Sequence, residues 1–547
     1  MIGKIDDPQW PFLAAFTDFK QENEVLEPVD CAVEGSIPSW LHGQLYRTGP
    51  GIFDIQAEGR TISLDHWFDG IAITHLFEIH QRGKVTYRNR VTGKSRKESI
   101  ERNGIMASTI GPFKDPCQAL YKKMFSVFGH PSQPSTLNVT VSPRLMLPGE
   151  KKPLCVLKTD ANALQFIDPN TLIPVEGPPK DYGVLNSELA KYPFSAAHEE
   201  YDPITDSFMN IVGNMGNKAE YIVFESFQNV PTTTATILAK FKDPYANFIH
   251  SFSSTSKYVI IQFWPLSFGS KGKKLFETTN MVDALEWDPK RNARFIVIDR
   301  LEQRVVVEYQ HPADFCFHTV NAFDDEDTGD VVLDLLMSGT GEQLAAYSVS
   351  QLRNITDQES LKRIRTLTTT RFQRLRLADL EEARMTYVHG DALPKTAPFA
   401  QVVFDDSISM ELPRINPKWR HRADYRFVYG VSTMFRHLHS HALFDSLVKF
   451  DVSTQSHVSW MKVGHTPSEP MFVPNPDGDG SEDDGVVLSI VLDGSLNKSY
   501  MLVLDAKNFE ELAKADIGQA CRMDFTELLC KSVVLSISLS ISCCYKF

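Results

Sequence analysis

Three histidines, His198, His250 and His318, lie in similar sequence settings. Each follows an apolar stretch and precedes a turn or another strand, as in the run CFHTVNAFDDEDTG (316–329) around the third of them. Neutral imidazole is a good ligand for iron, zinc and copper. Three imidazoles from separate strand–turn units therefore predict metal ligands that point inward from a radially repeated sheet.

Three carboxylates accompany these histidines. Asp160, Glu411 and Glu469 each lie among apolar residues or prolines, where an unpaired carboxylate would be costly. Metal-bound imidazoles commonly donate their second N–H to such a carboxylate, which orients the ring. The three acids are therefore candidates for holding the ligand rings, although buried acids also occur in purely structural ion pairs.

Two other arrangements of metal ligands remain open. His198-Glu199-Glu200 offers a histidine and a carboxylate for a site with two histidines and one carboxylate. That interpretation leaves His250 and the three buried acids unexplained. The segment RHLHSHALF (436–444) carries three histidines at alternate positions, which is typical of a surface metal site or of an exposed polar strand face.

The elements that must position these side chains are predominantly strands. A unit made of an apolar strand, a closing Asp and a polar turn recurs at 164–172, 294–300, 446–456 and 500–509. Alternation of strand and helix over about 30 residues does not occur, which disfavours a parallel α/β sheet. Repeated strand–turn units over most of the chain favour an all-β protein built as a β-propeller, with two stacked β-sandwiches as the alternative.

Composition excludes several classes of protein. The 547 residues carry a net charge of −13, which argues against nucleic-acid binding, and 42% are hydrophobic, as in a globular chain. Acidic residues and a proline in the first 16 residues are unlike a signal peptide, and no apolar run approaches the ~18 residues of a spanning helix. We expect a cytoplasmic protein.

An amphipathic stripe at 115–129 fits either a membrane-facing helix or core packing.

Several longer motifs resemble those of the carotenoid cleavage oxygenase family, most closely its animal carotene oxygenase and retinoid isomerase branch. The resemblance extends from about Val29 to Asp516. It is carried by GSIPSWLHGQLYRTGPG (35–51), DHWFDG (65–70), FHTVNAFDD (317–325), ELPRIN (411–416) and SEPMFVP with EDDGVVLS (468–489).

The resemblance implies a seven-bladed β-propeller with Fe(II) on its axis, below an α-helical and loop cap that forms an apolar tunnel. It implies a non-heme iron dioxygenase that cleaves a conjugated C=C bond of a carotenoid or apocarotenoid with O2, giving aldehyde or ketone products. His198, His250 and His318 would be metal ligands, and Asp160, Glu411 and Glu469 would hold ligand rings.

Details of the resemblance bear on substrate and location. Asp160 stands where the family usually has Glu, so it would reach its histidine less well or through water. Stilbene-cleaving relatives have a lysine where this chain has Thr159, so a stilbene-cleaving oxygenase is the weaker alternative. The segment 115–129 matches a family segment that faces the membrane, which favours peripheral membrane contact and a lipid-dissolved substrate.

The C-terminus departs from the family pattern. The family ends in a Pro-rich strand with Phe-His-Gly, which supplies a fourth ligand, whereas this sequence has no histidine after His465. We therefore expect residues 1–517 to form a single propeller domain and 518–547 to be an atypical tail outside it. Such a chain would bind iron through three histidines and lack its closing strand. A catalytically impaired or isomerase-like relative that binds apocarotenoids or retinoids is the alternative function.

Overall fold

The structure, a computed structural model, describes most of the chain. The described residues are 15–57, 59–104, 109–114, 137–145, 154–216, 218–227, 234–353, 358–386, 397–406, 408–433 and 443–521. The segment 115–129 and the histidines of 436–442 lie outside the described residues, as does the chain after Cys521.

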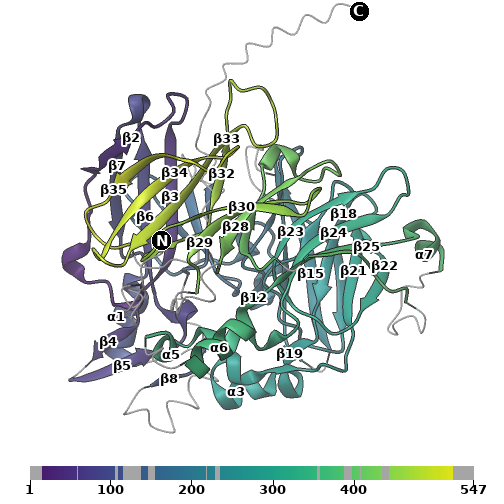
Figure 1. Cartoon of the computed structure of the whole chain (residues 1–547). Helices are drawn as coiled ribbons and strands as arrows, with labels where there is room; N and C mark the ends of the chain where they lie inside the picture. The colour runs from purple at the N-terminus through teal and green to yellow at the C-terminus, as the bar shows by residue number, and fades with distance from the viewer. Residues whose placement is uncertain are drawn as a thin grey trace, which may run out of the picture.

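Seven antiparallel sheets form the blades of a β-propeller (Figure 1). The first blade contains β1 (Val29–Asp30), β3 (Gly43–Ile52), β6 (Ile71–Ile79) and β7 (Val85–Arg90). The second contains β9 (Thr140–Leu145), β10 (Leu154–Lys158) and β11 (Gln165–Ile167). The third contains β12 (Phe194–Ser195), β13 (Glu200–Asp202), β14 (Ser207–Gly213), β15 (Ala219–Phe227) and β16 (Ala235–Asp243).

The remaining four blades follow in chain order. The fourth contains β17 (Ser253–Ser254), β18 (Tyr258–Phe263), β21 (Ala293–Asp299) and β22 (Arg304–His311). The fifth contains β23 (Cys316–Asp324), β24 (Val331–Met337), β25 (Arg371–Leu377) and β26 (Gln401–Asp406). The sixth contains β27 (Glu411–Arg414), β28 (Phe427–Ser432), β29 (Ser446–Asp451) and β30 (Ser456–Met461). The seventh contains β31 (His465–Pro467), β32 (Met471–Pro474), β33 (Gly485–Asp493), β34 (Lys498–Asp505), β35 (Glu511–Asp516) and β2 (Ala32–Gly35).

The seventh blade joins the two ends of the described chain. β2 pairs antiparallel with β35, with Ala32 opposite Asp516 and Gly35 opposite Ala513. The expectation that the propeller lacks its closing strand is therefore wrong. The pairing needs only main-chain groups of β2 and β35, and both strands precede residue 518.

The predicted strand–turn units form because both faces of an inner strand are buried between neighbouring blades. All seven residues of β21 and of β24 are buried, which suits their aliphatic, β-branched sequences. The closing Asp ends the strand by capping the turn. Asp299 accepts hydrogen bonds from the backbone N–H groups of Leu301 and Glu302, both at 2.9 Å.

Helices are few and short among the described residues. They are α1 (Lys94–Asn103), α3 (Lys273–Thr278), α4 (Met281–Ala284), α5 (Val349–Arg353), α6 (Gln358–Thr368) and α7 (Leu380–Thr386). The 3₁₀ turns are η2 (Gln21–Asn23), η3 (Trp67–Asp69), η4 (Gln81–Gly83), η5 (Tyr182–Val184), η6 (Leu189–Lys191), η7 (Gly269–Gly272), η8 (Gly341–Tyr347) and η9 (Pro417–Trp419).

The helices α3, α5 and α6 gather at one end of the propeller, the lower end in Figure 1. Two small sheets lie at the same end, β19 (Leu266–Phe268) with β20 (Leu285–Trp287), and β4 (Asp54–Ala57) with β5 (Arg60–Leu64) and β8 (Phe113–Lys114). Within the described residues, no helix has the length and apolar character that crossing a membrane requires.

Candidate metal centre

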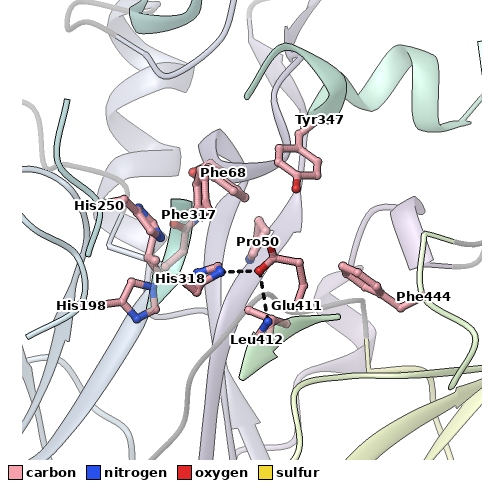
Figure 2. Close-up of a pocket in the computed structure, with 12 residues that line it drawn as sticks. Pro50, Phe68, His198, His250, Phe317, His318, Tyr347, Glu411, Leu412 and Phe444 are labelled. Carbon is pink, nitrogen blue, oxygen red and sulfur yellow. Dashed lines mark hydrogen bonds and ion pairs between the residues drawn. The ribbon is translucent and has the colours of Figure 1, made fainter. Parts of the chain in front are cut away.

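Three imidazoles from different blades meet in the structure. His318 lies on β23, His198 lies between β12 and β13, and His250 lies between β16 and β17. One ring nitrogen of each lies within 4.8 Å of those of the other two. The ring centroids are separated by 4.6 Å, 4.8 Å and 5.2 Å, so the rings surround a common point (Figure 2). The metal-ligating role of these rings is a prediction that this geometry supports.

Two of the three acids hold imidazoles directly. His250 Nδ1 donates to Asp160 Oδ1 at 2.8 Å. His318 Nδ1 donates to Glu411 Oε2 at 2.7 Å (Figure 2). An ionised carboxylate can only accept, so Nδ1 carries the proton and Nε2 keeps its lone pair for a ligand bond. Asp160 reaches its histidine without water, contrary to the expectation from its shorter side chain.

The chain positions the three rings through its backbone as well. The His198 N–H donates to the His250 carbonyl at 3.1 Å, which joins two of the histidine-bearing segments. The Ser251 hydroxyl donates to the Phe317 carbonyl at 2.7 Å, and Thr319 Oγ1 donates to the Phe252 carbonyl at 3.1 Å. These bonds connect the segment around His250 with β23, so all three rings are fixed relative to one another.

Burial favours the neutral form of His198 and His250. Desolvation lowers the pKa of His198 well below its ordinary value, and the neighbouring His250 and His318 rings lower it further. Desolvation also lowers the pKa of His250, against the opposing effect of Asp160. Neutral, preoriented nitrogen donors are the form of histidine that binds divalent transition metals. The residues present therefore fit a metal ion.

The third acid has a different partner. Glu469, between β31 and β32, accepts from Arg414 Nε through Oε1 at 2.9 Å. Its Oε2 is buried and has no hydrogen-bond partner among the described residues. Burial raises the pKa of Glu469, and the guanidinium groups of Arg414 and Arg47 oppose that shift. The role predicted for Glu469, holding a ligand ring, stays a prediction.

An apolar cavity adjoins the imidazoles on one side. Phe68, Phe317, Tyr347 and Phe444 contribute aromatic rings to it, and Figure 2 shows them around His318 and Glu411. The cavity measures about 20 Å³, which is room for a water-sized molecule. A larger apolar guest must therefore displace some of these side chains.

A larger cavity of about 340 Å³, with both charged and apolar side chains in its wall, reaches His198 and His318 from another side. Charged groups in its wall are paired: Lys158 Nζ lies 2.7 Å from Glu199 Oε2, and Arg420 pairs with Glu200. Both of these carboxylates are engaged by cations, and the cluster of candidate ligands among the described residues contains three imidazoles and no carboxylate. That arrangement does not favour a site with two histidines and one carboxylate.

Sequence reasoning did not identify the basic partners of this site. Arg414 lies in the ELPRIN motif, three residues after Glu411, and Arg47 lies in the motif that precedes the first turn of the chain. Both are long, charged side chains that are usually exposed. Only their contact with Glu469 distinguishes them, and the partner of an individual arginine has no sequence signal.

A seven-bladed propeller with three imidazoles meeting between its blades defines a class of metal-binding propeller proteins. The family described as "Retinal pigment epithelial membrane protein" matches residues 18–525. A carotenoid dioxygenase of Neurospora crassa is 32% identical, over 96% of this chain and 91% of the relative. A torulene dioxygenase of Gibberella fujikuroi is 30% identical, over 94% and 93% of the two chains. This chain belongs to that family, the carotenoid cleavage oxygenases.

Solved structures support the fold. A variant of Synechocystis apocarotenoid oxygenase superposes with a TM-score of 0.74 at 19% identity, covering 96% of this chain and all 100% of the other. The cobalt-substituted form of the Synechocystis oxygenase has a TM-score of 0.72 at 18% identity, with 96% and 99% covered. The all-β fold and the seven-bladed propeller predicted from the sequence are confirmed.

Proposed function

We propose that this protein is an iron-dependent oxygenase that cleaves one conjugated C=C bond of a carotenoid or apocarotenoid with O2. Each carbon of the cleaved bond takes one oxygen atom, so two carbonyl products form and no separate reductant is needed. The observation that carries this proposal is the cluster of three imidazoles beside an aromatic cavity. Relatives named carotenoid dioxygenase and torulene dioxygenase support the substrate class.

The ion that fits best is Fe(II). His198, His250 and His318 would hold it through their Nε2 atoms, because Nδ1 of the last two is engaged by carboxylates. The donor set alone also suits zinc, but zinc has no redox chemistry. Bound iron would supply electrons to O2 and leave positions open for it, which the cleavage of a polyene requires.

The protein's own side chains orient and desolvate the reactants. Asp160 and Glu411 hold two ligand rings in place. The aromatic rings of Phe68, Phe317 and Phe444 exclude water and present flat apolar faces to a polyene. Which double bond lies beside the imidazoles then decides where the polyene is cut, because proximity alone lowers the barrier for that bond.

The proposal is tested by product analysis with labelled oxygen. Protein loaded anaerobically with Fe(II) is given micellar β-carotene or an apocarotenoid under ¹⁸O₂, and we expect aldehydes that carry the label. The His250→Ala variant, which removes one donor, should form none. Bound polyene without labelled aldehydes would reject the oxygenase and favour the second candidate, an apocarotenoid- or retinoid-binding or isomerising relative.

Membrane contact and location belong to the same proposal. A polyene dissolves in lipid, so we propose that the protein is cytoplasmic and docks on a membrane surface through 115–129, a segment outside the described residues. Co-sedimentation with neutral phospholipid vesicles tests this. We expect binding that is lost when Phe125 and Phe128 are both replaced by Ser.

A further inference from the structure

Another open cavity lies at the helical end of the propeller. Its volume is about 740 Å³, which is within the usual range of sites that bind small molecules. The wall is formed by β19, β20, α4, η8 and α6, and Figure 1 shows β19 and α6 at the lower end of the molecule. This cavity shares no lining residue with the two cavities at the imidazoles, so it is separate from the proposed oxygenase site.

One side of this cavity is apolar. Leu266 and Trp287 stand opposite each other where β19 pairs with β20. Leu344 of η8 and Leu367 of α6 line the same space. Leu266 and Leu344 are buried, whereas Trp287 and Leu367 are only half-buried. Apolar side chains that remain partly accessible in a cavity offer a surface to the hydrocarbon chain of a ligand.

The Trp287 ring lies against the backbone of η8. A Cβ at Gly341 would lie 2.7 Å from Trp287 Cε3, so the absence of a side chain at Gly341 allows this close approach. Glu342 is the next residue and also lines the cavity, which places a carboxylate beside the tryptophan. Quaternary ammonium groups bind to the faces of aromatic rings, and a neighbouring negative charge adds to that attraction.

Charged side chains of both signs surround the apolar side. Glu342 and Glu359 are acidic, Lys362 and Arg363 are basic, and all four are exposed. Within the part of the chain that the structure describes, none of the four forms an ion pair. A purely anionic ligand would be attracted by the two bases and repelled by the two acids. A ligand that carries one positive and one negative group matches this wall better.

We propose that the cavity binds a phosphocholine lipid. The trimethylammonium group lies on the face of Trp287 beside Glu342. The phosphate contacts Lys362 and Arg363, which are side chains suited to phosphate oxygens. The first part of the acyl chains covers the leucines of the apolar side. Binding of this kind makes no covalent bond and needs neither a metal ion nor a polyene.

The position of the cavity favours a membrane lipid over a soluble phosphocholine compound. Val282 of its wall donates its backbone N–H to the Ile110 carbonyl at 2.8 Å. β8 begins three residues after Ile110 and directly precedes 115–129, the segment that we propose to dock on a membrane. The choice of a bilayer lipid rests on that proposed docking. The recognition of phosphocholine rests only on the side chains of the cavity.

Monomeric short-chain lipids test the recognition. The full chain, in the metal state in which it is isolated and without polyene, is titrated calorimetrically with dihexanoylphosphatidylcholine below its micellar concentration. We expect saturable binding. Dihexanoylphosphatidylglycerol has the same chains and a phosphate but no ammonium group, so it should bind about tenfold more weakly.

Four variants separate the contributions of the side chains. Glu342→Gln removes an exposed charge and should weaken binding of the phosphatidylcholine by about two- to fivefold. Trp287→Leu keeps an apolar side chain without the aromatic face, and should weaken the same lipid by about three- to tenfold but change the phosphatidylglycerol little. Lys362→Gln should weaken both lipids. Lys498→Gln, at an exposed lysine of β34 in the seventh blade, should change neither.

The outcomes decide between the sources of the ligand. Equal affinity for the two lipids, or unchanged phosphatidylcholine binding in Glu342→Gln, would overturn the recognition of the ammonium group. Free phosphocholine that binds as tightly as the lipid would overturn the role of the apolar side. Because the titrations measure neither cleavage nor vesicle docking, their failure is distinguishable from a failure of the proposed function.

Discussion

At the scale of single residues, short carboxylate–imidazole contacts define the candidate site. Asp160 holds His250 at 2.8 Å although its side chain is one methylene shorter than that of glutamate. It can do so because it lies two residues after the end of β10, within hydrogen-bond distance of the segment between β16 and β17 that carries His250. The position of the backbone thus compensates for the length of the side chain.

Replacing this carboxylate should weaken metal binding. Asp160→Asn keeps the shape and an acceptor oxygen but removes the negative charge, so we expect Co(II) affinity to fall by about 10- to 100-fold. Spectroscopic titration with Co(II) measures this directly. Asp160→Glu, which keeps the charge, should remain within a few-fold of the unchanged protein. Equal affinity for the Asn variant would show that Asp160 does not support a ligand.

At the scale of elements, Glu482 connects the sixth and seventh blades. It lies between β32 and β33, and its carboxylate accepts from the backbone N–H groups of Arg426 and Phe427 at the start of β28, at 2.7 and 2.8 Å. Burial raises the pKa of Glu482 to about 7, because desolvation outweighs these two hydrogen bonds.

This raised pKa should make stability depend on pH. The folded protein favours the protonated carboxyl, so the free energy of unfolding falls as pH rises from about 4.5, the ordinary pKa, to about 7. After allowance for partial solvent screening we expect a loss of about 1–2 kcal/mol. Glu482→Gln resembles the protonated form. The variant should have a higher Tm than the unchanged protein at pH 8 and the same Tm at pH 5. The same difference in Tm at both pH values would contradict this.

The strand pairing that closes the ring leaves no room for a side chain at Gly35. This residue of β2 has a φ of +83°, and a Cβ there would lie 2.3 Å from the carbonyl oxygen of Leu512 on β35. Gly59 has a similar φ of +77°, but a Cβ there would have no neighbour within 4 Å. Comparing alanine substitutions at Gly35 and Gly59 therefore separates the free-energy cost of the left-handed backbone conformation from the cost of a steric clash.

Alanine substitutions at these two positions test the closure. Gly59→Ala should lower the free energy of unfolding by about 1 kcal/mol, the usual cost of a left-handed conformation. Gly35→Ala should lower it by roughly 3 kcal/mol or more, because the clash with backbone adds to that cost. Urea unfolding measures both. Equal losses would mean that the pairing of β2 with β35 does not constrain this position.

At the scale of the whole molecule, the two ends of the described chain hold the propeller closed. Beyond β35, the Ile517 N–H donates to the Ser499 carbonyl at 3.1 Å, and the Cys521 N–H donates to Ser499 Oγ at 2.9 Å. Cys521 is 3% exposed. The boundary predicted at residue 517 stays a prediction, and these contacts favour a boundary a few residues later.

Two truncations should locate that boundary. Removing residues 522–547 should leave the urea midpoint unchanged, because Cys521 is the last described residue that contacts the closing blade. Removing 518–547 should lower the free energy of unfolding by roughly 2–4 kcal/mol, the usual range for losing buried apolar groups. A lower midpoint for the shorter deletion would show that residues after Cys521 belong to the fold.

Much of the architecture could be predicted from local patterns. A strand that ends in Asp and a polar turn needs only neighbouring residues, as at Asp299, so the blades were recognisable from the sequence. The three histidines were identifiable because their settings repeat. The partner of Glu469 could not be identified from the sequence. Arg414 is 55 residues away in another blade, and no local pattern indicates which side chains contact each other.

The sequence by itself determined the strand–turn repetition, the three imidazoles, the three acids and the absence of a histidine after His465. The tertiary structure alone decided that Asp160 holds His250 across 90 residues, that Glu411 holds His318 across 93, and that Glu469 faces Arg414. The physical reason is that a propeller brings residues from separate blades to one place. The sequence shows which residue types are present, whereas the contacts between them depend on how the sheets are ordered and packed.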